Sequence, residues 1–423
     1  MQVKKTTKVQ ASAAASARNN FEIEAIKGGV TAAAGFVAAG MKAGIKESGK
    51  PDLAIVYTET PAVGVGMFTT NAVRAASVNW CDEILPSPVV HAIICNSGCA
   101  NACTGKRGAA DNAKMADAVA DALGISCKAV LTASTGVIGK YLPMERINAA
   151  VPKLAAAVSA EGGAAFAEAI TTTDTAKKEA AVRVKCGSER FTIGAAAKGS
   201  GMIHPNMATM LCFITTDANI GSMLLTEIVK RASRHTFNNL TVDGDTSTND
   251  MALVLANGES GMAEIKKGTP AAKAFEAGLY EVFSEICKKI AADGEGATKR
   301  VEVNVKGGST EEDARRAAKA VAGSNLVKCA IFGNDPNWGR IACAVGYSGS
   351  EFAKHKMTID LCGVRVFENM MPAKFDEKKL SVKLKSSKVV PIDIELGVGK
   401  WATTAQTCDF SYDYVKINAE YRT

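Results

Sequence analysis

The chain alternates, from one end to the other, between short apolar runs and longer segments of helical periodicity, and this alternation constrains its fold most. The runs 52–57 and 89–95 are rich in Ile and Val, which predicts buried strands. In the segment 275–290, apolar residues instead recur every three or four positions, so we expect a long amphipathic helix that stops at Asp293 and Gly294. Strands and helices mix throughout, and we predict an α+β fold or a layered α/β fold.

Weaker patterns extend this prediction along the chain. Strand-like segments are expected at 129–133, 182–184, 191–193, 210–215, 301–305, 327–332, 357–361, 382–384 and 392–396. Helices are expected at 110–123, ended by Gly124, at 225–237, and from a capping box of Ser309 and Glu312 to Ala322. Two Ala-rich helices follow the strand at 129–133, and Pro152 is expected in the first turn of the second.

Length and composition narrow the class of protein. Domains hold about 100 to 200 residues, so 423 residues predict two or three of them. A hydrophobic fraction of 47% and a mean hydropathy of +0.04 exclude a disordered or fibrous chain. The net charge of +7 is dispersed along the chain, which favours small anionic ligands over nucleic acid. No apolar run reaches the roughly 18 residues that a membrane helix needs, so we expect no membrane partner.

The twelve cysteines are scattered and include no Cys-x-x-Cys pair, which indicates a reducing compartment and argues against a disulfide framework. Cys95, Cys99 and Cys103 are spaced by four, but no two of the four histidines are close together. We therefore interpret these cysteines as small buried thiols. The fragments 64–66 and 397–400 lack the remaining glycines of a phosphate-binding loop. We expect no metal and no cofactor.

Residues 1–20 have the composition of a targeting segment. They contain no acidic residue, four Lys or Arg residues, and many Ser, Thr and Ala residues. This composition is typical of an organelle transit segment and lacks the apolar stretch of a secretory signal. A plain disordered N-terminal arm fits the same composition equally well.

The segment from Lys198 to Leu211 could carry chemistry. Its glycines permit unusual backbone conformations, so the loop can bend a peptide bond against a neighbouring hydroxyl group. Attack of Thr209 Oγ on the Ala208 carbonyl, followed by hydrolysis, would free Thr209 as a new N-terminus. Its α-amine could then act as general base for its own hydroxyl group. An ordinary Gly-rich turn before a strand is the alternative interpretation.

Three further segments have unusual polar or glycine content. Thr135 and Gly136 follow a strand, where a Thr side chain and a Gly amide can form an oxyanion hole; an ordinary strand-to-turn junction is the alternative. The segment 243–250 is rich in side-chain oxygens but lacks the EF-hand Gly and Glu, so we interpret it as a hydrogen-bonded turn near a site. In 293–299, glycines flank Glu295 and let its carboxylate project into a cleft, unless this is simply a solvated helix end.

Taken together, these segments resemble the ornithine acetyltransferase family, the bifunctional glutamate N-acetyltransferases of arginine biosynthesis. The resemblance covers nearly the whole chain from about Ala25, and the order and spacing of the motifs make it specific. The motifs are GGVT at 28–31, STGVIG at 134–139, TTDT at 172–175, KGSGMIHPNMATML at 198–211, DGDTSTND at 243–250, DGEGATK at 293–299, DPNWGR at 335–340 and SYDYVKINAEYRT at 411–423.

The resemblance implies a layered αββα arrangement like that of N-terminal-nucleophile hydrolases, with different connectivity. It implies cleavage between Ala208 and Thr209, which gives an α chain of residues 21–208 and a β chain of residues 209–423 whose C-terminal lobe begins at about 300. Two copies of each chain are expected in an α2β2 heterotetramer. The likeness to plant and algal members implies a plastid location, with the cytoplasm as the alternative.

The resemblance also assigns roles to residues. It implies that Thr209 is the nucleophile and that Thr135 and Gly136 form the oxyanion hole. The substrate-contacting residues implied are Thr172, Lys198, Thr209, Glu295, Asn418 and Thr423. The reaction implied is ping-pong transfer of an acetyl group from N2-acetylornithine to glutamate, and acetyl-CoA as an additional donor stays open.

Two other functions are alternatives. A self-processing aminopeptidase or amidase on the related fold would let water resolve the acyl-enzyme, but such enzymes tend to use Ser where this chain has Thr209. A non-catalytic ligand or nucleic-acid binder would use the positive charge, which is dispersed here and forms no basic stripe with aromatic residues.

Overall fold

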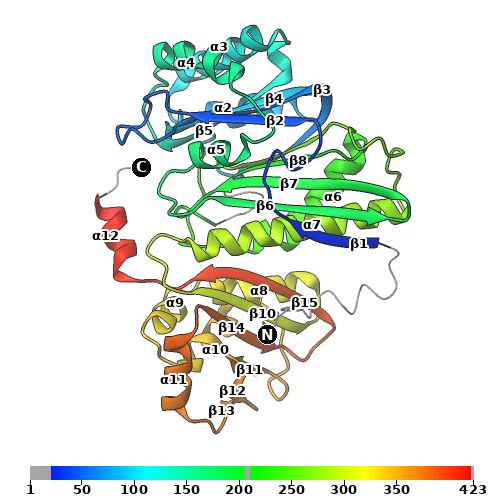
Figure 1. The fold of residues 1–423 in the computed structure, drawn as a ribbon. Helices are drawn as coiled ribbons and strands as arrows, with labels where there is room; N and C mark the ends of the chain where they lie inside the picture. Colours follow the sequence, from blue (N-terminus) through cyan, green and yellow to red (C-terminus); the bar gives the residue numbers. More distant parts are fainter. Residues whose placement is uncertain (1–20, 205–209, 421–423) are drawn as a thin grey trace, which may run out of the picture.

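The computed structural model describes residues 21–204 and 210–420 (Figure 1). The predicted N-terminal segment 1–20 lies outside the described residues. The strands are β1 Phe21–Ile26, β2 Phe36–Met41, β3 Leu53–Phe68, β4 Ser87–Cys99, β5 Val130–Val137, β6 Lys178–Cys186, β7 Glu189–Lys198, β8 Leu211–Thr216, β9 Met251–Ala256, β10 Arg300–Gly308, β11 Thr358–Leu361, β12 Val364–Glu368, β13 Met371–Pro372, β14 Val389–Glu395 and β15 Trp401–Cys408.

Helices alternate with these strands along the whole described chain. They are α2 Ala76–Ile84, α3 Gly105–Leu123, α4 Met144–Ala156, α5 Gly163–Ala169, α6 Ser222–His235, α7 Pro270–Ala292, α8 Glu311–Ala322, α9 Asn325–Phe332, α10 Trp338–Tyr347, α11 Glu377–Ser386 and α12 Tyr412–Glu420, with short 3-10 turns η1 Cys127–Ala129 and η2 Phe237–Asn239. The predicted α+β class is confirmed.

Within the described residues, the first sheet has the strand order β1-β6-β7-β8-β9-β3-β4-β5, with β2 beside β3. The long strand β3 joins its two halves: residues 53–58 pair with β2 and residues 53–64 with β4, whereas residues 63–68 pair with β9. Pairs β4–β5 and β8–β9 are parallel, and the other pairs are antiparallel. Strand β3 therefore has different neighbouring strands at its two ends, and this change lets the two halves of the sheet form separate layers.

Side chains that alternate along the strands fill three layers of core. Between the two halves of the sheet, Val56 and Ile93 belong to the same buried cluster as Phe213 and Leu253. The opposite face of β3 and β4 packs against α3 and α4 in a buried cluster that includes Leu53. Both faces of the central strands are buried, which explains their continuous apolar sequence. The order helices, sheet, sheet, helices is the predicted αββα layering (Figure 1).

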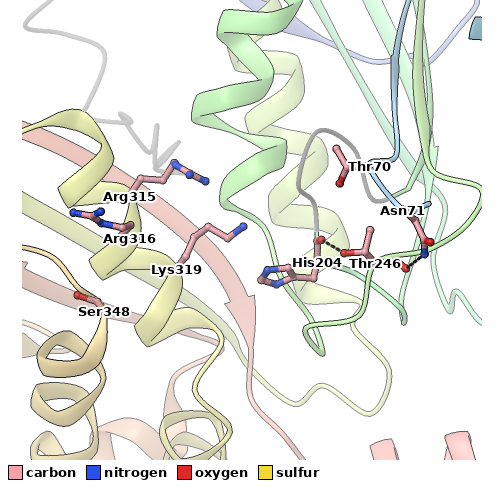
Figure 2. A pocket seen from close by; sticks show the side chains of 8 residues that line it. All are labelled: Thr70, Asn71, His204, Thr246, Arg315, Arg316, Lys319 and Ser348. Carbon is pink, nitrogen blue, oxygen red and sulfur yellow. Dashed lines mark hydrogen bonds between the residues drawn. The ribbon is translucent and has the colours of Figure 1, made fainter. Parts of the chain in front are cut away.

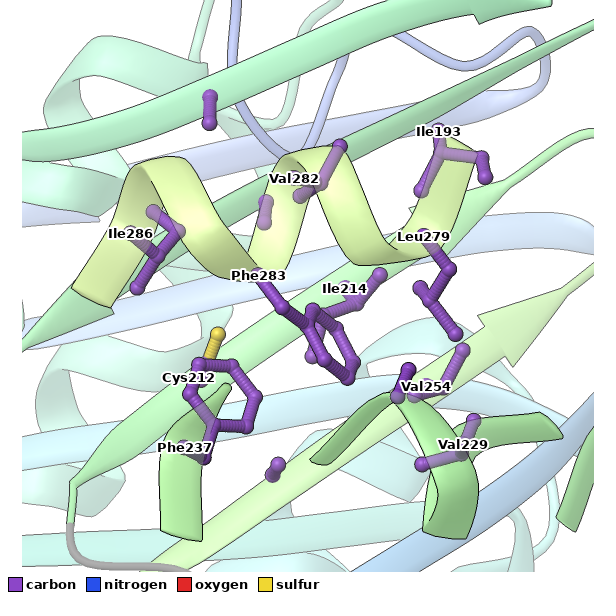
Figure 3. Packing of buried hydrophobic residues seen from close by; sticks show 14 of the residues in the cluster. Ile193, Cys212, Ile214, Val229, Phe237, Val254, Leu279, Val282, Phe283 and Ile286 are labelled. Carbon is purple, nitrogen blue, oxygen red and sulfur yellow. The ribbon is translucent and has the colours of Figure 1, made fainter. Parts of the chain in front are cut away.

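The long helix α7 closes the other outer face of the first sheet. Leu279, Val282 and Ile286 of α7 belong to the same buried cluster as the alternate side chains Cys212 and Ile214 of β8 (Figure 3). These α7 residues follow the three- and four-residue spacing seen in the sequence, so the predicted amphipathic helix is confirmed. The helix ends at the C-cap residue Asp293, which delivers the next segment to the edge of the sheet.

The second sheet has the strand order β13-β12-β11-β14-β10-β15 and is covered by α8 to α11 (Figure 1). Its buried face is formed by β-branched residues of β10 and β14, such as Val303 and Ile392. Helix α12 follows β15 and returns toward the first sheet. No helix in the two described ranges is long and apolar enough to cross a membrane.

The structure corrects five local predictions. Cys103, interpreted as a buried thiol, is exposed, whereas Cys95 and Cys99 are buried. The segments 327–332 and 382–384, predicted as strands, lie in helices α9 and α11. Pro152 lies inside α4 and not in a first turn. Helix α8 is capped one residue later than predicted, by Thr310, whose hydroxyl accepts a hydrogen bond from Asp313 N–H at 3.1 Å. Short apolar runs carry too few residues for a period, so packing in the tertiary structure decides their conformation.

Candidate active site

Six of the residues that the sequence marked lie around one cavity of about 100 Å³ at the edge of the first sheet. They come from the ends of β5 and β7, from two loops, and from α12. These residues are Thr135, Gly136, Thr172, Lys198, Glu295 and Asn418. The other three, Ala208, Thr209 and Thr423, lie outside the described residues.

Thr135 and Gly136 lie just before the end of β5, where its parallel pairing with β4 becomes irregular; this irregular strand end is called the Thr-Gly turn. Gly136 has φ +125°, and a Cβ at this position would lie 2.4 Å from the Gly98 carbonyl carbon. Only glycine allows both the conformation and the close approach of the two strands. Thr135 is 5% exposed and lines the cavity, so the turn presents a hydroxyl-bearing residue and a glycine to the same space.

Asn249 fixes this turn from a distant part of the chain. Its Nδ2 donates hydrogen bonds to the Ser134 carbonyl at 2.8 Å and to the Ala100 carbonyl at 2.6 Å. Its Oδ1 accepts a hydrogen bond from Thr248 Oγ1 at 2.6 Å. The segment 243–250 stands out in the sequence, but the role of Asn249 does not, because the two carbonyl groups that it binds are more than 100 positions away.

Asp174 organises the opposite wall of the cavity. Its carboxylate accepts hydrogen bonds from Thr172 N–H at 2.9 Å and Gly199 N–H at 2.7 Å, and it pairs with Lys178 Nζ at 2.5 Å. Burial would raise the pKa of Asp174, but the charges of Lys178 and Lys198 outweigh burial and hold the pKa below its usual value. This buried, ionised carboxylate therefore positions both Thr172 and the loop after Lys198.

Glu295 lies against the loop that follows β7. Its backbone N–H donates to the Ser200 carbonyl at 2.9 Å, and a Cβ at Gly201 would lie 2.2 Å from its Oε2. Asn418 Nδ2 donates a hydrogen bond to the same oxygen at 2.8 Å. Glu295 is 8% exposed, so its carboxylate is held in the cavity wall and not in bulk solvent.

Two aspartates of the segment 243–250 complete the cavity. Asp243 accepts hydrogen bonds from Met202 N–H at 2.6 Å and Ile203 N–H at 2.9 Å, which fixes the loop after Gly201. Burial raises the pKa of Asp250 to about 8, and the charge of Lys198 only partly opposes this effect. The cavity therefore combines one cation, Lys198, with the carboxyl group of Asp250 and with three further carboxyl groups, those of Asp243, Asp245 and Glu295.

Met210, which follows Thr209 in the sequence, is hydrogen-bonded to the first sheet. The Met210 carbonyl accepts a hydrogen bond from Met251 N–H at 2.9 Å, directly after Asp250. Leu211 pairs with Lys198 across strands β7 and β8. Among the described residues, no group of three or more His, Cys, Asp or Glu side chains could hold a metal ion.

A lysine, buried carboxylates and a Thr-Gly turn around one small cavity are suited to an enzyme that acts on small charged molecules. The ArgJ family model matches residues 37–423 of this chain. The arginine biosynthesis bifunctional protein ArgJ of Symbiobacterium thermophilum is 50% identical over 403 residues, which cover 95% of this chain and 100% of that protein. The chloroplastic protein of the same name from Oryza sativa subsp. japonica is 46% identical and covers 94% of this chain and 88% of that one.

Among solved structures, ornithine acetyltransferase from Mycobacterium tuberculosis, in complex with ornithine, is 42% identical over 44% of this chain and 100% of that chain, with a TM-score of 0.42. The family match and the bacterial relative show that the chain belongs to the ArgJ family. It is an acetyltransferase of arginine biosynthesis.

Proposed function

We propose that the chain cuts itself between Ala208 and Thr209 and then transfers acetyl groups by a ping-pong reaction on the new N-terminal threonine. Thr209 Oγ attacks the acetyl carbonyl of N2-acetylornithine, and the α-amine of Thr209 takes the hydroxyl proton. The tetrahedral intermediate collapses with cleavage of the carbon–nitrogen bond, and the amine returns the proton to departing ornithine. The amine of glutamate then attacks the threonine ester, which gives N-acetylglutamate and restores the hydroxyl group.

The observation that carries this proposal is the convergence of six residues from separate segments on one cavity beside the strand that Thr209 precedes. In the reaction, Thr135 and Gly136 stabilise the oxyanion. Preorganised donors at this position typically lower the barrier by about 2.7–4 kcal/mol each. Thr172 contributes to the substrate-binding wall, and Thr423 contacts the substrate.

Charge complementarity supports the substrate assignment. Both N2-acetylornithine and glutamate carry an α-carboxylate, which the Lys198 ammonium can bind. The side-chain ammonium of ornithine complements the carboxylate of Glu295, which Asn418 orients through its 2.8 Å hydrogen bond. Neither step requires a cofactor.

We further propose that acetyl-CoA is a second acetyl donor in the same reaction, in keeping with the name "bifunctional" of the relatives. The Thr209 hydroxyl attacks the thioester carbonyl, the carbon–sulfur bond breaks, and CoA leaves as a thiol with the proton from the hydroxyl group. Glutamate then accepts the acetyl group as before.

We also propose assembly as an α2β2 heterotetramer and a plastid location. The assembly rests on the family resemblance, and native mass spectrometry of the purified protein tests it. The plastid location rests on the composition of residues 1–20 and on the chloroplastic rice relative. Imaging of the chain fused to a fluorescent protein at its C-terminus distinguishes plastid from cytoplasm.

Denaturing mass spectrometry and acetyl-transfer assays test the function together. We expect two chains, the second starting at Thr209, and formation of N-acetylglutamate without comparable release of acetate. Thr209→Ala should stay uncut and inactive, while Thr209→Ser should still be cut, since it keeps a hydroxyl nucleophile. An active, uncut Thr209→Ala protein would contradict the proposal, and free acetate as the main product would favour an amidase.

A further inference from the structure

A second and larger cavity of about 500 Å³ lies between helix α8 and the loops of the first sheet (Figure 2). Arg315, Arg316 and Lys319 of α8 form one side, and Lys319 extends across toward His204. Among the described residues, the lining contains no acidic side chain. It consists of Thr70, Asn71, His204, Thr246, Arg315, Arg316, Lys319 and Ser348. Its volume falls within the range of small-molecule sites, about 300–1,000 Å³.

Two acidic residues of α8 pair with the arginines of this cavity but are not among the residues that line it. Glu312 forms a two-point ion pair with Arg315, at 2.9 and 2.6 Å, and Asp313 pairs with Arg316. Both acids belong to the preceding turn of α8, so they orient the guanidinium groups while leaving the lining positive. Because these ion pairs fix the guanidinium groups, the arginines present their N–H donors in a fixed arrangement.

Positive charge is concentrated at the centre of the cavity. Burial and then the charge of Arg315 lower the pKa of Lys319 to about 8, although Glu312 opposes this. Burial and then the charge of Lys319 lower the pKa of His204 to about 4, although Asp245 opposes this. An anion in the cavity would offset this repulsion and favour the protonated form of Lys319.

The large cavity and the candidate active site share a wall. His204 and Thr246 line the large cavity, while their neighbours Ile203, Asp245 and Ser247 line the active site. Thr246 Oγ1 donates a hydrogen bond to the His204 carbonyl at 3.0 Å, and Ile203 and Thr246 form an isolated β-bridge. A ligand bound by its charged end on α8 therefore lies next to the site of acyl transfer.

We propose that this cavity binds the phosphate groups of an acyl-CoA donor. The arginine and lysine side chains on α8 are the kind of charged donors that bind phosphates. The shared wall favours a donor whose phosphates lie in the large cavity and whose thioester reaches the active site. The inference rests on the proposed use of acetyl-CoA, and N2-acetylornithine, which has no phosphate, does not use this cavity.

Calorimetric titration of the wild-type enzyme tests the site without any turnover. The probes are CoA, pantetheine, which lacks all the phosphates, and inorganic phosphate. CoA should bind at least about tenfold more tightly than pantetheine, because charged hydrogen bonds are lost with the phosphates. The affinity for CoA should also fall as salt is added. Equal affinity for CoA and pantetheine, or tighter binding of inorganic phosphate than of CoA, would overturn the assignment.

Steady-state kinetics of variants test whether the phosphate groups of acetyl-CoA bind on α8. Lys319→Ala should raise KM for acetyl-CoA about tenfold while changing kcat/KM for N2-acetylornithine less than about twofold. Lys319→Arg should restore much of the loss, and Lys385→Ala, at an exposed lysine of α11, is the matched control. An unchanged KM for acetyl-CoA, or an equal loss in both reactions, would overturn the proposal. If the proposed function were wrong, the wild-type enzyme would be inactive with N2-acetylornithine. The CoA titration does not depend on this activity and tests the phosphate site alone.

Discussion

The carboxylate of Glu295 packs against the backbone of Gly201 so closely that a Cβ at this position would lie 2.2 Å from Glu295 Oε2. Gly201→Ala should therefore displace the carboxylate and lower kcat/KM for N2-acetylornithine roughly 10- to 100-fold, because small misplacements in an active site are costly. Gly346→Ala in α10 is the matched control, since a Cβ there meets no atom within 4 Å. Steady-state kinetics of both variants check this, and a Gly201→Ala enzyme as active as Gly346→Ala would rule out the assigned role of Glu295.

Asn249→Ala should weaken both the fold and the oxyanion hole. It removes two hydrogen bonds to the buried Ser134 and Ala100 carbonyls, which costs about 1–3 kcal/mol in the free energy of unfolding. Since Ser134 precedes the Thr-Gly turn, kcat should also fall about tenfold or more. Asn257→Ala is the matched control, because this buried Asn also bonds the Ala34 carbonyl and Thr58 but lies outside the cavity. Equal kcat in the two variants would remove Asn249 from the positioning of the turn.

Asp250→Asn should change how stability depends on pH. The pKa of Asp250 is raised to about 8 in the folded protein, against about 3.9 in an unfolded chain. The folded state therefore holds this proton more tightly, and the stabilisation it gives is complete below about pH 4 and is lost as the pH rises toward 8. The Tm of the wild type should fall relative to that of Asp250→Asn between pH 5 and pH 8.

Asp174→Asn is the control for this pH experiment, because its effect on stability should depend on pH in the opposite direction. Because the pKa of Asp174 is lowered in the folded protein, its carboxylate stabilises the fold above its unfolded pKa and loses this effect as the pH falls. Asp174→Asn should therefore be less stable than the wild type at neutral pH and approach it in acid. Parallel Tm curves for the wild type and Asp250→Asn over this pH range would refute the raised pKa of Asp250.

Removal of residues 418–423 should abolish activity with little change in Tm, because no side chain of α12 is fully buried. The single substitution Asn418→Ala removes the donor to Glu295 and should raise KM for N2-acetylornithine about tenfold. Lys416→Ala, at an exposed position of the same helix, should behave as the wild type. Full activity of the truncated chain would show that the C-terminal segment has no part in the site.

The sequence predicted the parts of the site that have a local signature. Thr135 with Gly136 and Glu295 between glycines stand out because turns at strand and helix ends require such residues. Asn249 and Asp174 were missed as positioning residues, since their partners are set by the pairing of β4 with β5 and by the loop after β7. The cationic cavity could not be predicted because α8 and the loops that face it meet only in the tertiary structure.

Among the helices and strands too, some are predicted by a local sequence pattern and others are determined only by the tertiary structure. The helix α7 was predicted because 23 residues give a clear period, whereas the six-residue run in α9 does not. The continuous apolar runs predict the central strands. Why both faces of these strands are buried follows only from the structure, in which β3 pairs with different strands along its length.

Mass spectrometry of the enzyme quenched in acid after mixing with N2-acetylornithine alone tests the central claim most directly. The account predicts that the chain beginning at Thr209 gains the mass of one acetyl group on that residue, and that added glutamate removes it as N-acetylglutamate. An intact chain that transfers acetyl groups, or a cut enzyme that transfers them without ever carrying one on Thr209, would contradict it.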